Sequence, residues 1–253
     1  VGPPKVGKSF LALDIAIKIA RGEDFLGNKT HPNKVLYFQL DTSEMVMRDR
    51  GLALRQSGYD TNAPLLGMIH PADAIRPVNA TMALGQDYFR KAIKLHDPAL
   101  VVLDTLRECH QEDENDSTGM KRAMDDLEDL FIGRTLALVH HTSKLPPEIT
   151  QPNPILASRG SSYITGKVDA YWLLYNNKLT ITSRWDEPFT LTATQGINGM
   201  FNFPNAISRD EKSAQVKELI EKNPTMGKDE LAAIAASKYG ISRAMFYSLA
   251  QST

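Results

Sequence analysis

Disulfide bonds and membrane spans are the first features that this sequence lacks. Its 253 residues contain one cysteine, Cys109, which excludes an internal disulfide framework and favours a reducing compartment such as the cytoplasm. No apolar run approaches the roughly 18 residues that a transmembrane helix needs. We therefore expect a cytoplasmic protein with no membrane partner.

A charge excess of either sign is also missing. Lysine and arginine number 29 against 30 aspartates and glutamates, which gives a formal net charge of −1. This balance argues against a broadly cationic coat for nucleic acid and leaves room only for a local basic patch. Hydrophobic residues make up 42% and charged residues 23%, the composition of a globular chain. The length suits one large α/β domain with a small second domain.

The N-terminal stretch has the form G-x-x-x-x-G-K-[ST], the P-loop pattern, and an amphipathic run follows it at once. Glycines let backbone N–H groups curl around phosphate oxygens, and a helix beginning near Gly7 directs its dipole at the same anion. Lys8 is expected to reach the β- and γ-phosphates of ATP, and the Ser9 hydroxyl to ligate Mg²⁺. A Gly/Pro turn before an ordinary helix is the simpler alternative, and the length of the pattern argues against it. The residues expected to bind nucleotide are Gly2, Pro3, Pro4, Lys5, Val6, Gly7, Lys8, Ser9 and Phe10.

P-loops follow a buried parallel strand, yet only Val1 precedes Gly2 here. We therefore expect the first strand to lie upstream of Val1.

Three short apolar runs, at residues 34–40, 99–103 and 135–139, each end in polar residues. They have the length and composition of buried parallel strands, and open α/β sheets bind ligands at such strand ends. The second run has the Walker B form, so Asp104 is expected to bind Mg²⁺ through water or through Ser9.

Two sets of side chains raise the question of a metal site. His140 and His141 follow the third run, but no third ligand lies at a suitable spacing, which disfavours zinc. At this strand end either histidine is better placed to hydrogen-bond the γ-phosphate or the attacking water. The loop after the second run is either a metal site or a solvated acidic loop, and its spacing favours the second reading. Its acidic residues are Glu108, Glu112, Asp113, Glu114 and Asp116.

From residue 167 the period changes to that of antiparallel strands, followed by a linker and short helices. The predicted strands span residues 168–175, 178–184, 189–193 and 200–203. The predicted helices span residues 214–221, 229–237 and 243–250. The last two helices, with Gly240 between them, predict a helix-turn-helix in which Arg243 faces DNA. A small helical cap for protein contacts remains the alternative.

With these residues in view, the chain resembles the RecA-like hexameric ATPases, and among them the RepA-type replicative helicases of plasmids, phages and mobile elements. The resemblance covers about residues 1–203 and is carried, in order, by GPPKVGKS, VLYFQLDTSE, VVLDTL, DEND, LVHHTSK, ASRGSSYITGKVDAYWLLY and SRWDEP. GPPKVGKS is a general P-loop motif, whereas HHTSK and RGSS are the motifs that point to the RepA-type group. The DnaB-type helicases look like more distant relatives, through FQLDTSEMVMR and TSRWDEP.

The resemblance implies an α/β fold with a mostly parallel central sheet flanked by helices and with antiparallel strands at its C-terminal edge. Residues 1–204 would form this RecA-like core, and residues 205–253 a small helix-turn-helix-like domain. It further implies Mg²⁺-dependent ATP hydrolysis in a homo-oligomeric ring, a hexamer, that binds single-stranded DNA and drives DNA translocation or unwinding.

The resemblance also implies roles for particular residues. Relatives have a glutamate that polarises the attacking water, and Asp41 stands at that position, with Glu44 one turn later as the alternative. Arg184 would be the arginine finger inserted into the neighbouring subunit's nucleotide.

Two loops, residues 107–118 and 143–162, match the pore loops that contact DNA in relatives. The first is acidic here, which repels phosphates, and the second offers only Lys144 and Arg159 as positive charges. This departure from the family pattern argues against DNA translocation more than against ATP binding. Two alternatives therefore stay open, which are a nucleotide switch in recombination or regulation without unwinding, and a DNA-binding regulator with a structural nucleotide site.

Overall fold

The computed structural model describes residues 1–70, 78–144, 149, 152–184, 188–241 and 243–251. Its centre is a parallel sheet with the strand order β2-β1-β3-β4. The strands are β1 (Val35–Gln39), β2 (Leu66–Ile69), β3 (Leu100–Asp104) and β4 (Thr135–Val139). Gln39 lies opposite Asp104, and Asp104 opposite Val139. The carboxyl ends of these three strands therefore share one edge of the sheet.

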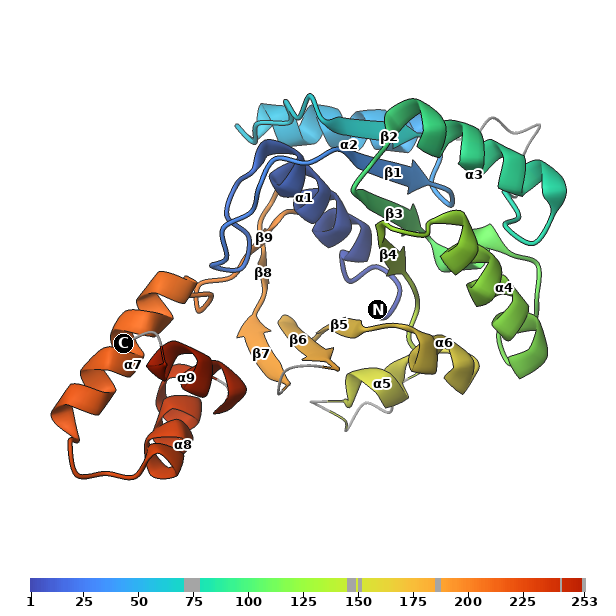
Figure 1. Cartoon of the computed structure of the whole chain (residues 1–253). Coiled ribbons are helices and arrows are strands. Elements are labelled where there is room, and N and C mark those ends of the chain that lie inside the picture. The colour runs from blue at the N-terminus through green and yellow to red at the C-terminus, as the bar shows by residue number, and fades with distance from the viewer. Residues whose placement is uncertain (71–77, 145–148, 150–151, 185–187, 242, 252–253) are drawn as a thin grey trace.

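Helices cover both faces of this sheet (Figure 1). They are α1 (Lys8–Arg21), α2 (Glu44–Gln56), α3 (Ala83–His96) and α4 (Ser117–Leu130). Strand residues alternate between the faces. Tyr37 and Val102 pack in one cluster with residues of α1, and Phe38 and Leu103 pack in another with residues of α3 and α4. Because both faces are covered, every residue of β1 and β3 is buried.

A second, antiparallel layer lies beside the parallel sheet. It comprises β5 (Ala170–Tyr175), β6 (Lys178–Ser183) and β7 (Phe189–Thr192) in one sheet, with β8 (Thr194–Gln195) and β9 (Phe201–Asn202) as a separate pair. Asn176 and Asn177 make the tight turn between β5 and β6 with positive φ angles of 47° and 55°. The extended residues Val1 and Gly2 join the two layers, since the Leu174 amide donates to the Val1 carbonyl and Gly2 pairs with His141.

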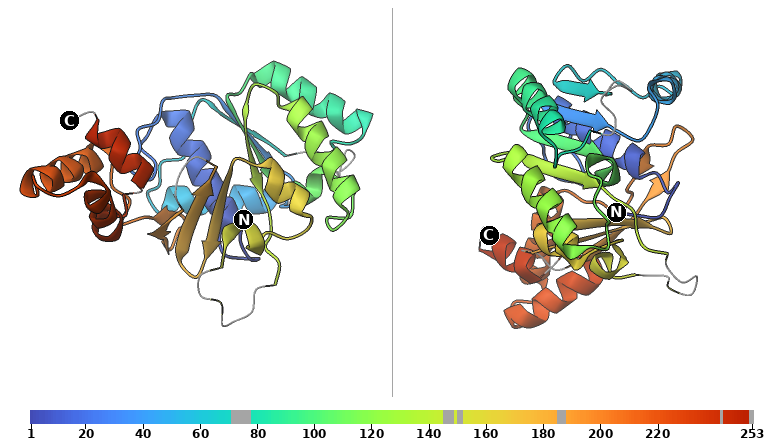
Figure 2. Two further views of the ribbon diagram at one scale, coloured as in Figure 1. Left: turned by 60° about the horizontal axis from the view of Figure 1, so that its bottom comes forward. Right: turned by 90° about the vertical axis from the view of Figure 1, so that its right-hand side faces the viewer.

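Three C-terminal helices form their own apolar cluster at one side of the molecule (Figure 2). They are α7 (Arg209–Lys222), α8 (Lys228–Tyr239) and α9 (Arg243–Ala250). Phe246 and Val216 are fully buried in this cluster. Whether these helices act as a helix-turn-helix stays a prediction.

The predicted fold class, a parallel sheet flanked by helices with antiparallel strands on the C-terminal side, is confirmed. Several boundaries were wrong, because caps rather than apolar periodicity set the helix ends. The Ser208–Glu211 capping box starts α7 at residue 209 instead of 214, and the Asp116 side chain caps α4 at residue 117 in a similar way. The strand expected from 168 begins at 170, after the short helix α6 (Ser162–Lys167). No helix within the described ranges is long and apolar enough to cross a membrane.

Candidate functional site

The P-loop leaves the first turn of α1 open to an anion. Gly7, the N-cap residue of α1, has a φ of 93° and makes no side-chain cap, so the N–H groups of that turn remain available. A Cβ on Gly7 would lie 2.8 Å from Gln195 Nε2, and one on Gly2 would lie 2.7 Å from the Leu174 carbonyl oxygen. Gly7 is therefore required both by its positive φ and by close approach, and Gly2 by close approach alone.

Lys8 projects from this loop to the edge of the sheet. Its Nζ donates to the Pro3 carbonyl at 2.8 Å and lies 3.2 Å from His141 Nδ1. An ammonium can only donate, so His141 Nδ1 accepts and the imidazole is neutral. Burial, and then the charge of Lys8, lower the pKa of His141. A bound phosphate would compete with Pro3 and His141 for the Lys8 ammonium.

Asp104 lies buried at the end of β3 beside Ser9. The Tyr37 hydroxyl donates to Asp104 Oδ2 at 2.7 Å, and the Ser9 hydroxyl also bonds this carboxylate. Burial raises the pKa of Asp104, against these two hydrogen bonds. In the part of the chain that the structure describes, Oδ1 has no hydrogen-bond partner. A buried carboxylate oxygen without a partner, next to a hydroxyl, is a donor set that suits Mg²⁺.

The structure brings Asp41, and not Glu44, towards Lys8. The Asp41 carboxylate follows β1, and its charge raises the pKa of both Lys8 and His141, against the effect of burial. Its Oδ1 accepts from Gln39 Nε2 at 3.1 Å and from Thr42 Oγ1 at 2.8 Å. Glu44 is exposed in the first turn of α2. Lys8, Asp41, Asp104 and His141 thus converge on one edge.

His140 points away from this group, towards the loop beyond β4. It is buried, and its Nε2 lies 2.8 Å from the Arg159 carbonyl oxygen. Burial lowers the pKa of His140, against that hydrogen bond. Of the two neighbouring histidines, one therefore faces the P-loop and the other faces the predicted DNA loop.

The prediction that the acidic loop is solvated was wrong for one of its residues, Glu114. Glu114 is only 4% exposed, its Oε2 lies 3.0 Å from Arg159 Nε, and its carbonyl accepts from the Ser161 amide. The two loops therefore pack against each other, which no local pattern in either loop could reveal. Among the described residues, no group of three or more histidine, cysteine or acidic side chains could hold a metal ion.

Arg184 and Arg243 make their contacts outside the P-loop. Arg184 is 53% exposed at the end of β6, where it donates to the Gly166 carbonyl at 2.6 Å and pairs with Asp169 at 3.5 Å. The next three residues of its motif, 185–187, lie outside the described residues. Lys144 is exposed, and Arg243 pairs with Asp229 on α8.

Sequence reasoning missed three side chains at the site: Tyr37, Gln39 and Arg50. The half-buried Arg50 guanidinium of α2 lies 5.2 Å from the centroid of the Phe10 ring, and its charge lowers the pKa of Asp104 against the effect of burial. An arginine on a polar helix face gives no local signal. Two polar groups within a buried apolar strand, Tyr37 and Gln39, are a signal that could have been used.

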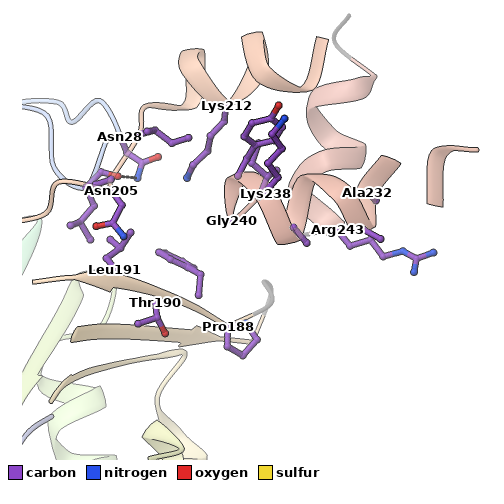
Figure 3. Close-up of a pocket in the computed structure, with 18 of the residues that line it drawn as sticks. Asn28, Pro188, Thr190, Leu191, Asn205, Lys212, Ala232, Lys238, Gly240 and Arg243 are labelled. Atoms are coloured by element: carbon purple, nitrogen blue, oxygen red, sulfur yellow. Dashed lines mark hydrogen bonds between the residues drawn. The ribbon is translucent and has the colours of Figure 1, made fainter. Parts of the chain in front are cut away.

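A cavity of about 760 Å³ lies elsewhere, between β7, the linker before α7 and the C-terminal helices (Figure 3). Thr190, Asn205, Lys212 and Lys238 are among its lining residues. None of the lining residues belongs to the P-loop or to the edge of the parallel sheet. This cavity is therefore separate from the nucleotide site.

Comparison with known proteins bears on the N-terminal part of the chain. The sequence model of the AAA domain family matches residues 1–146. The chain belongs to the AAA domain family. Together with the geometry of the P-loop, this makes it a P-loop ATPase. A KaiC-like protein of the hyperthermophilic archaeon Pyrococcus horikoshii OT3 is similar at 13% identity, over 79% of this chain and 86% of that chain, with a TM-score of 0.46.

Proposed function

We propose that this protein is a Mg²⁺-dependent ATPase that assembles into a ring, a hexamer, and drives DNA translocation or unwinding as a RepA-type replicative helicase. The observation that carries the proposal is the position of Arg184. Its guanidinium is 53% exposed and pairs with Asp169, not with a residue of the P-loop, so it is open to a neighbouring subunit. A site that needs a finger in trans needs a neighbour, and a closed ring supplies one to every subunit.

The residues at the sheet edge divide the chemistry of hydrolysis among them. Lys8 and the backbone amides of the P-loop hold the phosphates, while Ser9 and Asp104 hold Mg²⁺. When bound, Mg²⁺ neutralises charge that develops on the phosphate oxygens. Asp41 orients a water whose oxygen bonds to the γ-phosphorus as the bond from that phosphorus to the β–γ bridging oxygen breaks. The electron pair leaves with ADP, and a water proton passes to a carboxylate such as Asp41. Arg184 of the neighbour stabilises charge on the transferring group.

The end of β4 offers a route from the nucleotide to DNA. His141 contacts Lys8 and can report whether a γ-phosphate is present, while His140, the residue before it, hydrogen-bonds the carbonyl of Arg159. A shift of this strand end on nucleotide binding would move Arg159, one of the two cations in the predicted DNA loop. Lys144 is the other.

One observation favours a second candidate, a nucleotide switch that does not unwind DNA. The Arg159 guanidinium pairs with buried Glu114, which leaves less positive charge for the phosphates of a DNA strand. In this alternative the ATPase cycle would reorganise the two loops for a protein partner in recombination or regulation.

A single comparison separates the two candidates. ATP hydrolysis is measured with and without single-stranded DNA, together with the mass of the assembly in solution. The helicase proposal predicts stimulation by DNA in a six-fold assembly. A slow monomeric ATPase that ignores DNA would contradict it and favour the switch.

A further inference from the structure

Gln39 ends strand β1, whose preceding residues are the apolar or aromatic Val35, Leu36, Tyr37 and Phe38. Its side chain is 1% exposed, and it lies opposite Asp104 in the register of the sheet. Burying an amide is unfavourable unless its donors and acceptors find partners. A glutamine at this position therefore needs an explanation that an apolar side chain would not.

The contacts of the amide point to Asp41. Gln39 Nε2 donates to Asp41 Oδ1 at 3.1 Å and lies 3.5 Å from the Asp104 carbonyl oxygen. An ionised carboxylate only accepts, so it is the NH₂ side of the amide that faces Asp41. Thr42 Oγ1 donates to the same Oδ1 at 2.8 Å. Two donors thus occupy one oxygen of Asp41 and leave Oδ2 for another donor.

We propose that Gln39 is a positioning residue that fixes the Asp41 carboxylate so that Oδ2 accepts from the attacking water. The inference rests on the proposed function, in which Asp41 orients that water. Asp41 is exposed in the loop that follows β1, where Thr42 also donates to it. A buried amide on a rigid strand holds the carboxylate where the loop alone would not.

The buried Oε1 of Gln39 has no partner among the described residues. The amide is thus held through its NH₂ group alone, which faces Asp41 and the Asp104 carbonyl.

The test replaces Gln39 with a side chain of similar length that cannot donate. For Gln39→Met we expect kcat to fall by about 10- to 100-fold, because misplacing a reacting group by about 1 Å costs this much. KM and the Kd for an ATP analogue should stay within about twofold, because Gln39 touches neither the P-loop nor the phosphates. The matched control is Gln86→Met in α3, whose amide donates to the Ala80 carbonyl, and its kcat should stay within about twofold. A Gln39→Met variant with the kcat of the wild type would overturn the inference.

A double-mutant cycle separates positioning from a general structural effect. In an Asp41→Ala background, Gln39→Met should cause no further loss of kcat, since Gln39 acts through Asp41. Losses that multiply in the double variant would contradict this. In the nucleotide-free protein, the ¹³C resonance of the Asp41 carboxyl should move in Gln39→Met and not in Gln86→Met.

Failure of the inference and failure of the proposed function give different results. If the wild type hydrolyses ATP while Gln39→Met keeps its kcat, only the role of Gln39 is wrong. If the wild type does not hydrolyse ATP, the proposed function is wrong. In that case the resonance of Asp41 alone decides whether Gln39 holds its carboxylate, and an unmoved resonance in Gln39→Met overturns that contact.

Discussion

The polar groups at the carboxyl edge of the parallel sheet differ from the arginines outside this edge in their hydrogen-bond and ion-pair partners. At the edge, Asp104 Oδ1 and Gln39 Oε1 are buried without partners among the described residues, and Lys8 is held by groups that a phosphate can replace. Beyond the edge, the arginines predicted to act in trans or on DNA each pair with a carboxylate of the same chain. The pairs are Arg159 with Glu114, Arg184 with Asp169, and Arg243 with Asp229.

The nucleotide site can therefore accept its ligand as it stands, whereas these arginines must first leave their carboxylate partners. Exposed ion pairs contribute about 0–1 kcal/mol, so Arg184 and Arg243 can leave their partners at little cost. Arg159 differs from them, because Glu114 is buried. Arg159 is itself 56% exposed, but moving it away would leave the buried Glu114 carboxylate without this partner, which costs more than breaking an exposed pair. Nucleotide binding is therefore built into the fold, whereas DNA binding through Arg159 needs a rearrangement.

The largest effect should come from a substitution at the carboxyl edge of the sheet. For Lys8→Ala we expect ATP turnover to be abolished, because the Lys8 ammonium is the group proposed to hold the β- and γ-phosphates. Steady-state phosphate release measures this. Lys91→Ala, in an exposed ion pair on α3, is the comparison, and its replacement should leave most turnover. Near wild-type turnover in Lys8→Ala would remove the P-loop assignment.

Arg184→Ala tests one of the arginines outside the sheet edge, which must leave Asp169 before it can act on a neighbouring subunit. We expect hydrolysis to fall by roughly 10³-fold, the usual contribution of an arginine finger, while the Kd for nucleotide stays unchanged. Phosphate release and binding of a fluorescent nucleotide are measured together. Arg122→Ala, on the exposed face of α4, serves as the control and should change neither. If nucleotide binding were lost with hydrolysis, Arg184 would act on its own subunit or stabilise the fold.

Glu114→Gln sharpens the comparison between the two regions by freeing Arg159. The substitution keeps the shape of the side chain and removes its charge, so single-stranded DNA should bind about threefold to tenfold more tightly, with a steeper dependence on salt. Fluorescence anisotropy at several salt concentrations measures both quantities. Glu112→Gln, in the same loop, should have a smaller effect. Unchanged DNA affinity in Glu114→Gln would show that Arg159 does not contact DNA.

The smallest predicted effect concerns pH. Because burial lowers the pKa of His140, the unfolded state binds more protons than the folded state as the pH falls through the ordinary histidine range. This contribution to stability is therefore fully present above about pH 7 and decreases as the pH falls through the ordinary histidine range. His140→Gln should flatten the dependence of the free energy of unfolding on pH, by about 1.4 kcal/mol for each unit of pKa shift that it removes. Urea unfolding at several pH values measures it, and an identical dependence in both proteins would contradict it.

Much of this arrangement could be predicted from the sequence, because it follows from local patterns. The P-loop, the buried strands of residues 34–40 and 99–103, and the meeting of Asp41 with Asp104 follow from apolar runs that end at one edge. The contacts that cross between elements could not be predicted. The burial of Glu114 depends on the packing of two loops, and the position of Arg50 over Phe10 depends on how α2 lies against α1.

The central claim, a site shared between subunits of a ring, is tested most directly by mixing two inactive variants. Lys8→Ala keeps its finger, and Arg184→Ala keeps its P-loop. Random mixing in a ring would therefore restore about a quarter of the interfaces. We predict that each variant alone is inactive and that the mixture regains a corresponding fraction of ATP turnover. No recovery in a mixture that demonstrably exchanges subunits would contradict a site built from two neighbours.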